Sequence, residues 1–472
     1  MKEAISVLLL MRSEMMIVLT IVILLIMKVA DTGKSSNFWL GAINAFLLIN
    51  CLLGWLPINE GIAFGGMFKS FALASFGKNI LSTGVLLISL TSTEWLRKCR
   101  HLIEFYLLLL SSLLGMFFML SSGNLLMFYL SLELASIPLA ALCNFNFEER
   151  RSSEAAMKMI LSSAFASSIM LMGISFIYGE GGTLDFEALT LIMHESVLFV
   201  IGFVFLFVGI VFKLSVVPFH LWTADVYEGS PVPVTAFLSV ISKGAMVIVF
   251  SSLLYHVFGA LHTTWYGLLY MLSILTILTG NIFAIRQNNL KRLLAFSSIT
   301  QMGYILIGIL GTSAEGIGAS LYFIVIYMFS NIAAFGVIAI VSAKTGNERI
   351  SSFVGLSKSN PFLAWTMAIA LFSLAGIPPT AGFFGKIFLL KAGAAKADIF
   401  LIVFAAINMI IALSYYLKVI RAIFMDTNAE SFESIRSGYS YRIAIVICLI
   451  GIVGIGFVGN IYEFIYSLTK SI

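Results

Sequence analysis

The sequence predicts an all-α polytopic membrane protein with about 14 transmembrane helices, and three observations lead to this fold class. Of the 472 residues, 60% are apolar and only 11% are charged. The mean hydropathy is +1.03. Apolar runs long enough to cross a bilayer follow one another with short loops between them. A soluble chain is nearer half apolar and a quarter charged, so a water-soluble enzyme is excluded.

Each apolar run is long enough to span the hydrocarbon core, which takes about 20 residues of helix. Inside lipid every backbone polar group must be bonded within its own segment, so these runs are expected to be helices. They fall at 14–30, 37–56, 70–91, 102–121, 123–143, 155–178, 196–219, 231–256, 264–285, 292–312, 316–343, 361–392, 397–424 and 440–466.

Basic residues are distributed unequally between the loops. Those after odd-numbered helices carry Lys28, Lys34, Arg97, Lys98, Arg100, Arg150, Arg151, Arg286, Lys291, Arg292, Lys344, Arg349, Lys358, Lys418, Arg421, Arg436 and Arg442. The other side carries only Lys2, Arg12, Lys69, Lys391, Lys396 and Lys470. Cytoplasmic loops are enriched in lysine and arginine, so the odd loops are expected to be cytoplasmic and both termini to lie outside.

The remaining basic residues lie within the predicted helices, and all of them are lysines: Lys78, Lys158, Lys213, Lys243 and Lys386. A charge at the middle of a bilayer costs at least ~2.5–3.5 kcal/mol, so such residues usually have a function. A desolvated lysine can release its proton, whereas arginine effectively cannot. The set therefore indicates a protein that handles protons.

Two of the predicted helices are interrupted by proline. Pro218 lies in 196–219, and Pro378 and Pro379 lie in 361–392. Proline removes a backbone donor, and broken helices five apart are typical of inverted-repeat transporters. We therefore expect helices 1–3 (1–100), a first repeat of helices 4–8 (101–258), a second of helices 9–13 (259–425) and helix 14 (426–472).

Glu133 is the acidic residue that we expect to act together with the lysines in the predicted helices. Glu133 lies midway along helix 5, and the lysines run from an inner position (Lys213) through the middle (Lys243) to an outer one (Lys386). A carboxylate beside an amine favours its protonated form, so a Glu–Lys contact that opens and closes would switch proton affinity. The alternative is a static ion pair with structural lysines.

Other polar residues have two possible roles. Lys158 follows Glu154 by four residues, so it is either a proton entry point or a residue that snorkels to the surface. His220 either caps the broken helix 7 or relays protons. Ser298 and Tyr304 belong to a polar stretch of helix 10 that could hold a water wire, and Lys78 is expected to be structural.

No cofactor site is expected. The four cysteines show no CxxC spacing, and the five histidines lie at or beyond the ends of apolar runs. An iron–sulfur cluster, a structural metal and a haem are therefore not expected. No GxGxxG or Walker sequence occurs, which argues against nucleotide binding.

Three stretches resemble the antiporter-like subunits of respiratory complex I. They are VFKLSVVPFHLWTADVYEGSPVPVTAFLSVISK (211–243), NLKRLLAFSSITQMGYILIG (289–308) and FSLAGIPPTAGFFGK (372–386). The turn from Asp225 to Gly229, the lysine at 243 and an end soon after helix 14 favour the bacterial N-type subunit of NADH:quinone oxidoreductase, counterpart of mitochondrial subunit 2. Weaker similarity runs over 101–425.

The resemblance implies a proton-translocating subunit of the bacterial inner (plasma) membrane, driven by quinone reduction elsewhere. Glu133, Lys213, Lys243 and Lys386 would move protons from cytoplasm to periplasm, and Lys158 stands where the family often has a lysine. Quinone, NADH, FMN and iron–sulfur clusters are expected on partner subunits. The expected partners are neighbouring membrane subunits and the lipid bilayer, with no nucleic acid. Alternatives are an Mrp-type cation/proton antiporter subunit and a purely structural subunit.

Overall fold

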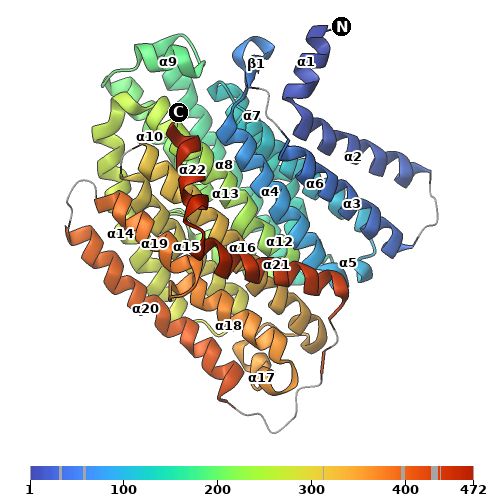
Figure 1. Ribbon diagram of the computed structural model, residues 1–472. Helices are drawn as coiled ribbons and strands as arrows, with labels where there is room; N and C mark the ends of the chain where they lie inside the picture. Colours follow the sequence, from blue (N-terminus) through green and yellow to red (C-terminus); the bar gives the residue numbers. More distant parts are fainter. Residues whose placement is uncertain are drawn as a thin grey trace. The chain divides into compact units, whose positions relative to one another are not determined.

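A computed structural model shows a chain built almost entirely of helices (Figure 1). The structure describes residues 2–30, 35–56, 60–311, 313–394, 399–426, 434–435 and 437–470. Three basic residues used for the orientation, Lys34, Lys396 and Arg436, lie outside these ranges.

The predicted apolar runs are helical within the described residues. Most correspond to one helix each: α2 (Arg12–Val29), α3 (Ser36–Gly54), α4 (Ala72–Thr91), α6 (Leu102–Leu120), α7 (Leu125–Cys143), α8 (Arg150–Gly181), α10 (Val197–Leu214), α14 (His262–Ile285), α15 (Leu290–Ile309), α16 (Ser313–Thr345) and α20 (Ile399–Phe424). Three runs hold two helices each: α12 (Val232–Phe237) with α13 (Lys243–His256), α18 (Pro361–Ala375) with α19 (Ala381–Gly393), and α21 (Tyr439–Phe457) with α22 (Gly459–Lys470).

Several shorter elements were not predicted, because they are too short to form apolar runs that span a membrane. The helices are α1 (Lys2–Leu10), α5 (Thr93–Lys98), α9 (Phe186–Ile192), α11 (Leu221–Gly229) and α17 (Leu356–Ser359). The strands β1 (Gly61–Ala63) and β2 (Phe68–Ser70) form an antiparallel hairpin. The remaining turns are η1 (Phe64–Gly66), η2 (Leu238–Ser242), η3 (Gly259–Leu261) and η4 (Ile350–Phe353).

Twelve helical segments of the described chain are long and apolar enough to cross a membrane. Of the predicted crossings, α2 falls short because Arg12, Glu14 and Lys28 lie within its 18 residues, and α18 because it has only 15. The fold class is therefore confirmed as a multi-pass helical membrane protein, while the count of fourteen crossings stays a prediction.

The chain divides into two compact units. Unit 1 takes in residues up to Leu86, Leu96–Lys213 and Ile241–Trp265, and unit 2 takes in Leu87–Trp95, Leu214–Val240 and residues from Tyr266 onwards. The two units are described separately below.

Unit 1 is organised around the pair α6 and α7. A Cβ on Gly115 of α6 would lie 2.4 Å from the backbone nitrogen of Ala135, so only glycine permits this close approach. The hydroxyl of Ser112 donates to the Ala135 carbonyl across the same interface, at 2.7 Å. Helix α7 begins where the Asn124 side chain accepts from the Met127 amide, a typical N-cap. Helix α2 packs along α3 and α6 (Figure 1).

Unit 2 is organised around α16, a helix of 33 residues in whose most apolar stretch 94% of the residues are buried. It packs against α15, α18, α19, α21 and α22, and α15 in turn packs against α19. Helix α15 begins at Asn289, whose side chain accepts from the Arg292 amide at 3.2 Å. A helix that is apolar on all sides must be buried, and α16 is therefore the core of this unit.

Candidate functional site

Lys213, in the last turn of α10, is buried in unit 1 and is held by two hydroxyl groups. Its Nζ donates to Ser136 Oγ of α7 at 2.6 Å and to Ser163 Oγ of α8 at 2.8 Å. An amine in this position needs polar partners, because an unbonded ammonium away from water is costly. The two serines come from different helices, so the lysine joins α7, α8 and α10.

Glu133 lies one helical turn before Ser136 on α7. No ion pair within 4.0 Å joins Glu133 to Lys213 among the described residues, and Glu133 Oε1 is buried without a hydrogen-bond partner there. The expected direct contact is therefore open in this structure. Residues three apart on a helix lie on the same face, so Glu133 and Ser136 share one side of α7. In this structure the Ser136 hydroxyl, and not the Glu133 carboxylate, contacts the Lys213 amine.

Lys243 begins α13 and is 1% exposed. The residues before it, Leu238–Ser242, form the π-helical turn η2 between α12 and α13. Such π-helical turns occur frequently at functional sites, because they interrupt the regular backbone bonding and reposition side chains. Helix α13 packs against α6 in unit 1.

Lys158 is not buried as Lys213 and Lys243 are. Its Nζ pairs with Glu154 at 2.6 Å across one turn of α8, and its side chain is 42% exposed. An exposed pair at this spacing contributes little to stability. The structure therefore places Lys158 on the surface of unit 1, on the same helix as Ser163.

The break after α10 belongs to unit 2. The backbone turns at Ser215 (φ 62°) and contains a cis peptide bond before Pro218. The Val217 amide donates to Thr276 Oγ1 of α14 at 3.2 Å instead of continuing the helix. His220 precedes α11 and makes no side-chain capping hydrogen bond, and its buried Nδ1 has no partner among the described residues.

The second break separates α18 from α19 and positions Lys386. A helical amide bonds the carbonyl four residues earlier, so Pro378 and Pro379 cannot supply donors to Leu374 and Ala375. Lys386, which is fully buried, supplies them instead: its Nζ donates to the Leu374 carbonyl at 2.7 Å and to the Ala375 carbonyl at 3.2 Å. The prolines of the break thus create the polar partners of the lysine.

A glycine allows α19 to return close to α18. A Cβ on Gly382 would lie 1.9 Å from the carbonyl oxygen of Ser373. The Ser373 hydroxyl accepts from Ser330 Oγ of α16 at 2.8 Å. The break is therefore fixed by packing on both sides and by a bond to the core helix.

A buried polar chain leads from Lys386 to α20. Gln301 Nε2 of α15 donates to the same Leu374 carbonyl at 3.0 Å and to the Tyr416 hydroxyl at 3.3 Å. The Tyr416 hydroxyl also contacts Ser297 Oγ at 2.5 Å. A side-chain amide and a hydroxyl can each donate and accept, so this chain could pass a proton stepwise with intervening water.

Ser298 and Tyr304, singled out from the sequence, lie on α15, the helix that also carries Ser297 and Gln301. Tyr304 donates to the Ala405 carbonyl at 3.1 Å, and its ring lies under Lys386, with Nζ 4.9 Å from the ring centre. Ser298 is completely buried. The sequence reasoning missed Tyr416, Ser136 and Ser163, although a polar residue inside an apolar run is the same signal that identified the lysines.

An ionic cluster lies at the start of α15. Arg292 Nη1 contacts Asp225 Oδ1 at 2.7 Å and Glu228 Oε2 at 3.0 Å, both on α11. Lys291 pairs with Glu348 at 2.7 Å and donates to the Ser230 carbonyl at 2.9 Å. The segment after the first break is thus anchored by charge to α15.

No group of three or more histidine, cysteine or acidic side chains is placed to hold a metal ion in the described part of the chain. Lys213 and Lys386 are instead buried in helices with hydroxyl and carbonyl oxygens as their hydrogen-bond partners. This chemistry suits the exchange of protons.

Multiple apolar helices, two proline breaks and buried lysines define a multi-pass membrane protein with ionisable groups inside its helices. The chain belongs to the family described as NADH:quinone oxidoreductase/Mrp antiporter, TM, which matches residues 122–412. It is 48% identical over 414 residues to NADH-quinone oxidoreductase subunit N of Azobacteroides pseudotrichonymphae genomovar. CFP2, which covers 87% of this chain and 86% of that protein.

Solved structures have the same fold. A chain of respiratory complex I from Thermus thermophilus with bound aureothin superposes with a TM-score of 0.79 and 26% identity, covering 95% of this chain and 97% of that one. A chain of the Mrp complex from Dietzia sp. DQ12-45-1b superposes with a TM-score of 0.86 over 97% of this chain and 96% of that one. Its identity is 19%, so that likeness concerns the fold alone.

Proposed function

We propose that this chain is the proton-translocating N-type subunit of an NADH:quinone oxidoreductase, in which it moves protons and carries out no redox chemistry itself. The single observation that supports this most strongly is Lys386, a fully buried amine held by carbonyls that the proline break leaves without helical donors. The 48% identity to a subunit N supports the same assignment. NADH, FMN, iron–sulfur clusters and quinone belong to partner subunits in this proposal.

In unit 1 the proton carrier is Lys213, and Glu133 sets its proton affinity. With the Glu133–Lys213 contact open, Ser136 and Ser163 hold the amine. When the carboxylate approaches, it stabilises the ammonium form, and when it withdraws the proton can pass on. Lys243, at the π-helical turn, receives the proton next.

In unit 2 the carrier is Lys386, from which the proton leaves toward the periplasm. Its partners are two carbonyls, which accept hydrogen bonds but cannot take the proton themselves. Gln301, Tyr416 and Ser297 offer groups that both donate and accept. His220, Ser298 and Tyr304 are further relay candidates, and Lys158 is a candidate entry point at the surface.

The repeat organisation and the orientation belong to this proposal. Helices 4–8 (101–258) and 9–13 (259–425) form two inverted repeats, flanked by helices 1–3 (1–100) and helix 14 (426–472). The excess of basic residues in the odd loops supports a cytoplasmic position for those loops and periplasmic termini in a bacterial inner membrane.

The experiment is the Lys243→Ala variant in the intact complex, with proton pumping and electron transfer measured in the same vesicles. We expect fewer protons per electron, because the middle carrier is lost. Lys358→Ala is the matched control, since Lys358 is exposed. An assembled Lys243→Ala enzyme with wild-type stoichiometry would refute the assignment of Lys243.

Purification of the native assembly separates the alternatives. Flavin and iron–sulfur subunits are expected to purify with this chain. Purification with small membrane subunits alone would favour an Mrp-type antiporter. Variants that impair assembly and never alter coupled turnover would favour a purely structural subunit.

A further inference from the structure

Unit 1 contains a buried ion pair of an acid and a lysine, outside the part of the chain that the family matches. Lys78 Nζ of α4 contacts Glu14 Oε1 of α2 at 2.5 Å. The two side chains are only 3% and 1% exposed. Residues 122–412 define the family match, so neither residue belongs to the segment that carries the resemblance.

The pair is incompletely satisfied. Glu14 Oε2 is buried and has no hydrogen-bond partner among the residues that the structure describes. A carboxylate that serves only as a structural brace normally has both oxygens bonded, because an unsatisfied buried oxygen costs free energy. The carboxylate is therefore not fully bonded as a structural brace would be.

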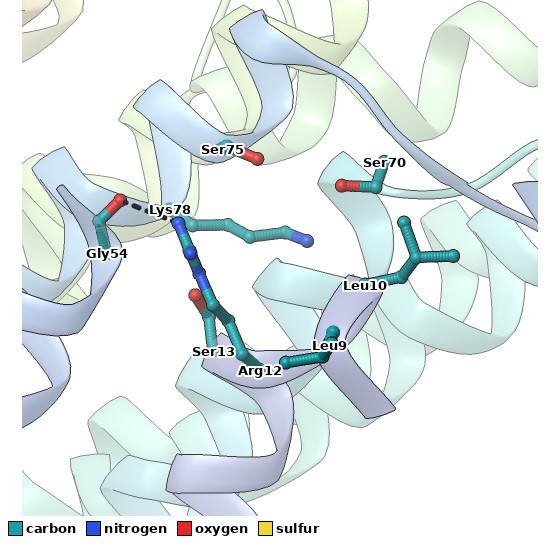
Figure 2. A pocket seen from close by; sticks show the side chains of 8 residues that line it. All are labelled: Leu9, Leu10, Arg12, Ser13, Gly54, Ser70, Ser75 and Lys78. Carbon is teal, nitrogen blue, oxygen red and sulfur yellow. Dashed lines mark hydrogen bonds between the residues drawn. The ribbon is translucent and has the colours of Figure 1, made fainter. Parts of the chain in front are cut away.

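A polar pocket leads to the lysine of this pair (Figure 2). Its walls are Leu9, Leu10, Arg12, Ser13, Gly54, Ser70, Ser75 and Lys78. Figure 2 shows the Lys78 side chain extending among the others, with Arg12 bonded to the Gly54 carbonyl. Three hydroxyls and two cationic groups can bind water, so water in this pocket would contact the Lys78 amine.

The charged groups around this pair are held by other partners, so Glu14 and Lys78 are the groups here that we expect to exchange a proton. Arg12 also donates to the Leu56 carbonyl at 2.6 Å, which ties it to the end of α3. Lys69 on β2 pairs with Glu187. On α6, which packs against α2, Glu104 is partly exposed and pairs with Lys28 at 2.8 Å, and Tyr106 is buried.

We infer that Glu14 and Lys78 form an additional proton-relay site, which exchanges protons with water through the pocket at the ends of α2, α3 and α4 during turnover. Lys78, which lines the pocket, passes a proton from its Nζ to Glu14 Oε1 across their contact and takes another from a hydronium ion, which leaves as water. The carboxylate becomes a neutral acid, and Lys78 remains an ammonium ion. Release is the reverse step. In the proposed orientation these helix ends face the periplasm, so the inference rests on the proposed function.

The test uses the intact complex and two measurements. Infrared difference spectra during NADH-driven turnover report a protonated carboxyl group, and a pH-sensitive dye in vesicles reports protons per electron. We expect Glu14→Gln to remove one carboxyl band and Glu14→Gln/Lys78→Met to lower the protons pumped per electron. The double variant leaves no unpaired buried charge, which favours assembly. Glu104→Gln is the control and is expected to keep both the band and the yield.

A band that persists in Glu14→Gln, or an unchanged yield in the double variant, overturns the inference. If the double variant fails to assemble, the exchanged pair Glu14→Lys/Lys78→Glu keeps an ion pair. It is expected to show the band at a displaced frequency, and an unchanged or absent band overturns the inference. None of these results affects the assignment of Lys243, which is tested separately.

Discussion

Replacing Ser136 and Ser163 by alanine tests how Lys213 is held. The structure shows two hydrogen bonds from the amine, at 2.6 and 2.8 Å, in a place buried from solvent. A hydrogen bond to a charged group contributes about 1.5–3 kcal/mol. Loss of one bond should therefore shift the equilibrium between a lysine that holds its proton and one that has passed it on by roughly tenfold to a hundredfold. Loss of both should exceed that range.

The assay is proton pumping by the assembled complex in vesicles, followed with a pH-sensitive dye alongside NADH oxidation. We expect the double alanine variant to pump several-fold more slowly while the complex still assembles. Ser162→Ala is the matched control, because that neighbouring hydroxyl bonds the Lys158 carbonyl of its own helix. Wild-type pumping in the double variant would show that these hydroxyls do not govern Lys213.

Three further predictions concern unit 2 and the orientation. Lys386→Met should abolish most proton pumping. The control Lys391→Met changes the last turn of the same helix and should leave pumping near normal. Equal effects of the two variants in the dye assay would argue against a specific role of Lys386. Tyr416→Phe should slow pumping by up to about tenfold, because one hydroxyl of the polar chain is lost. The control Tyr439→Phe, at an exposed tyrosine, should leave the rate unchanged. Identical rates in the two variants would exclude a relay through the Tyr416 hydroxyl. Burial raises the pKa of the Cys99 thiol, so its alkylation should accelerate above the usual thiol range. An impermeant maleimide should label Cys99 in inside-out vesicles only, and labelling from the opposite side would reverse the orientation.

Much of the fold could be predicted from composition and run length, because lipid leaves a helix as the only option for an apolar span. The prolines marked both breaks, and burial of Lys213, Lys243 and Lys386 followed from the cost of placing a charge in lipid. Each of these inferences follows from the chemistry of a single residue and does not require knowledge of how the helices pack.

The partners of the lysines could not be predicted in the same way. Which hydroxyl reaches Lys213 depends on the rotation of α7 and α8 about their axes, and serine is common in membrane helices for packing reasons alone. Tyr416 was missed because a tyrosine in an apolar run reads as an interfacial or packing residue. Lys78 was interpreted as structural because its acid, Glu14, lies 64 positions earlier, in a segment with no motif.

Point mutations can change the hydrogen-bond partners of Lys213 more easily than those of Lys386. The hydroxyls beside Lys213 belong to side chains, so single codon changes can strengthen, weaken or remove them. The oxygens beside Lys386 are main-chain atoms that persist whatever amino acid occupies positions 374 and 375. Only a change at Pro378 or Pro379 could return a competing amide. Natural variation can therefore tune the first lysine gradually, whereas the second is fixed as long as the prolines remain.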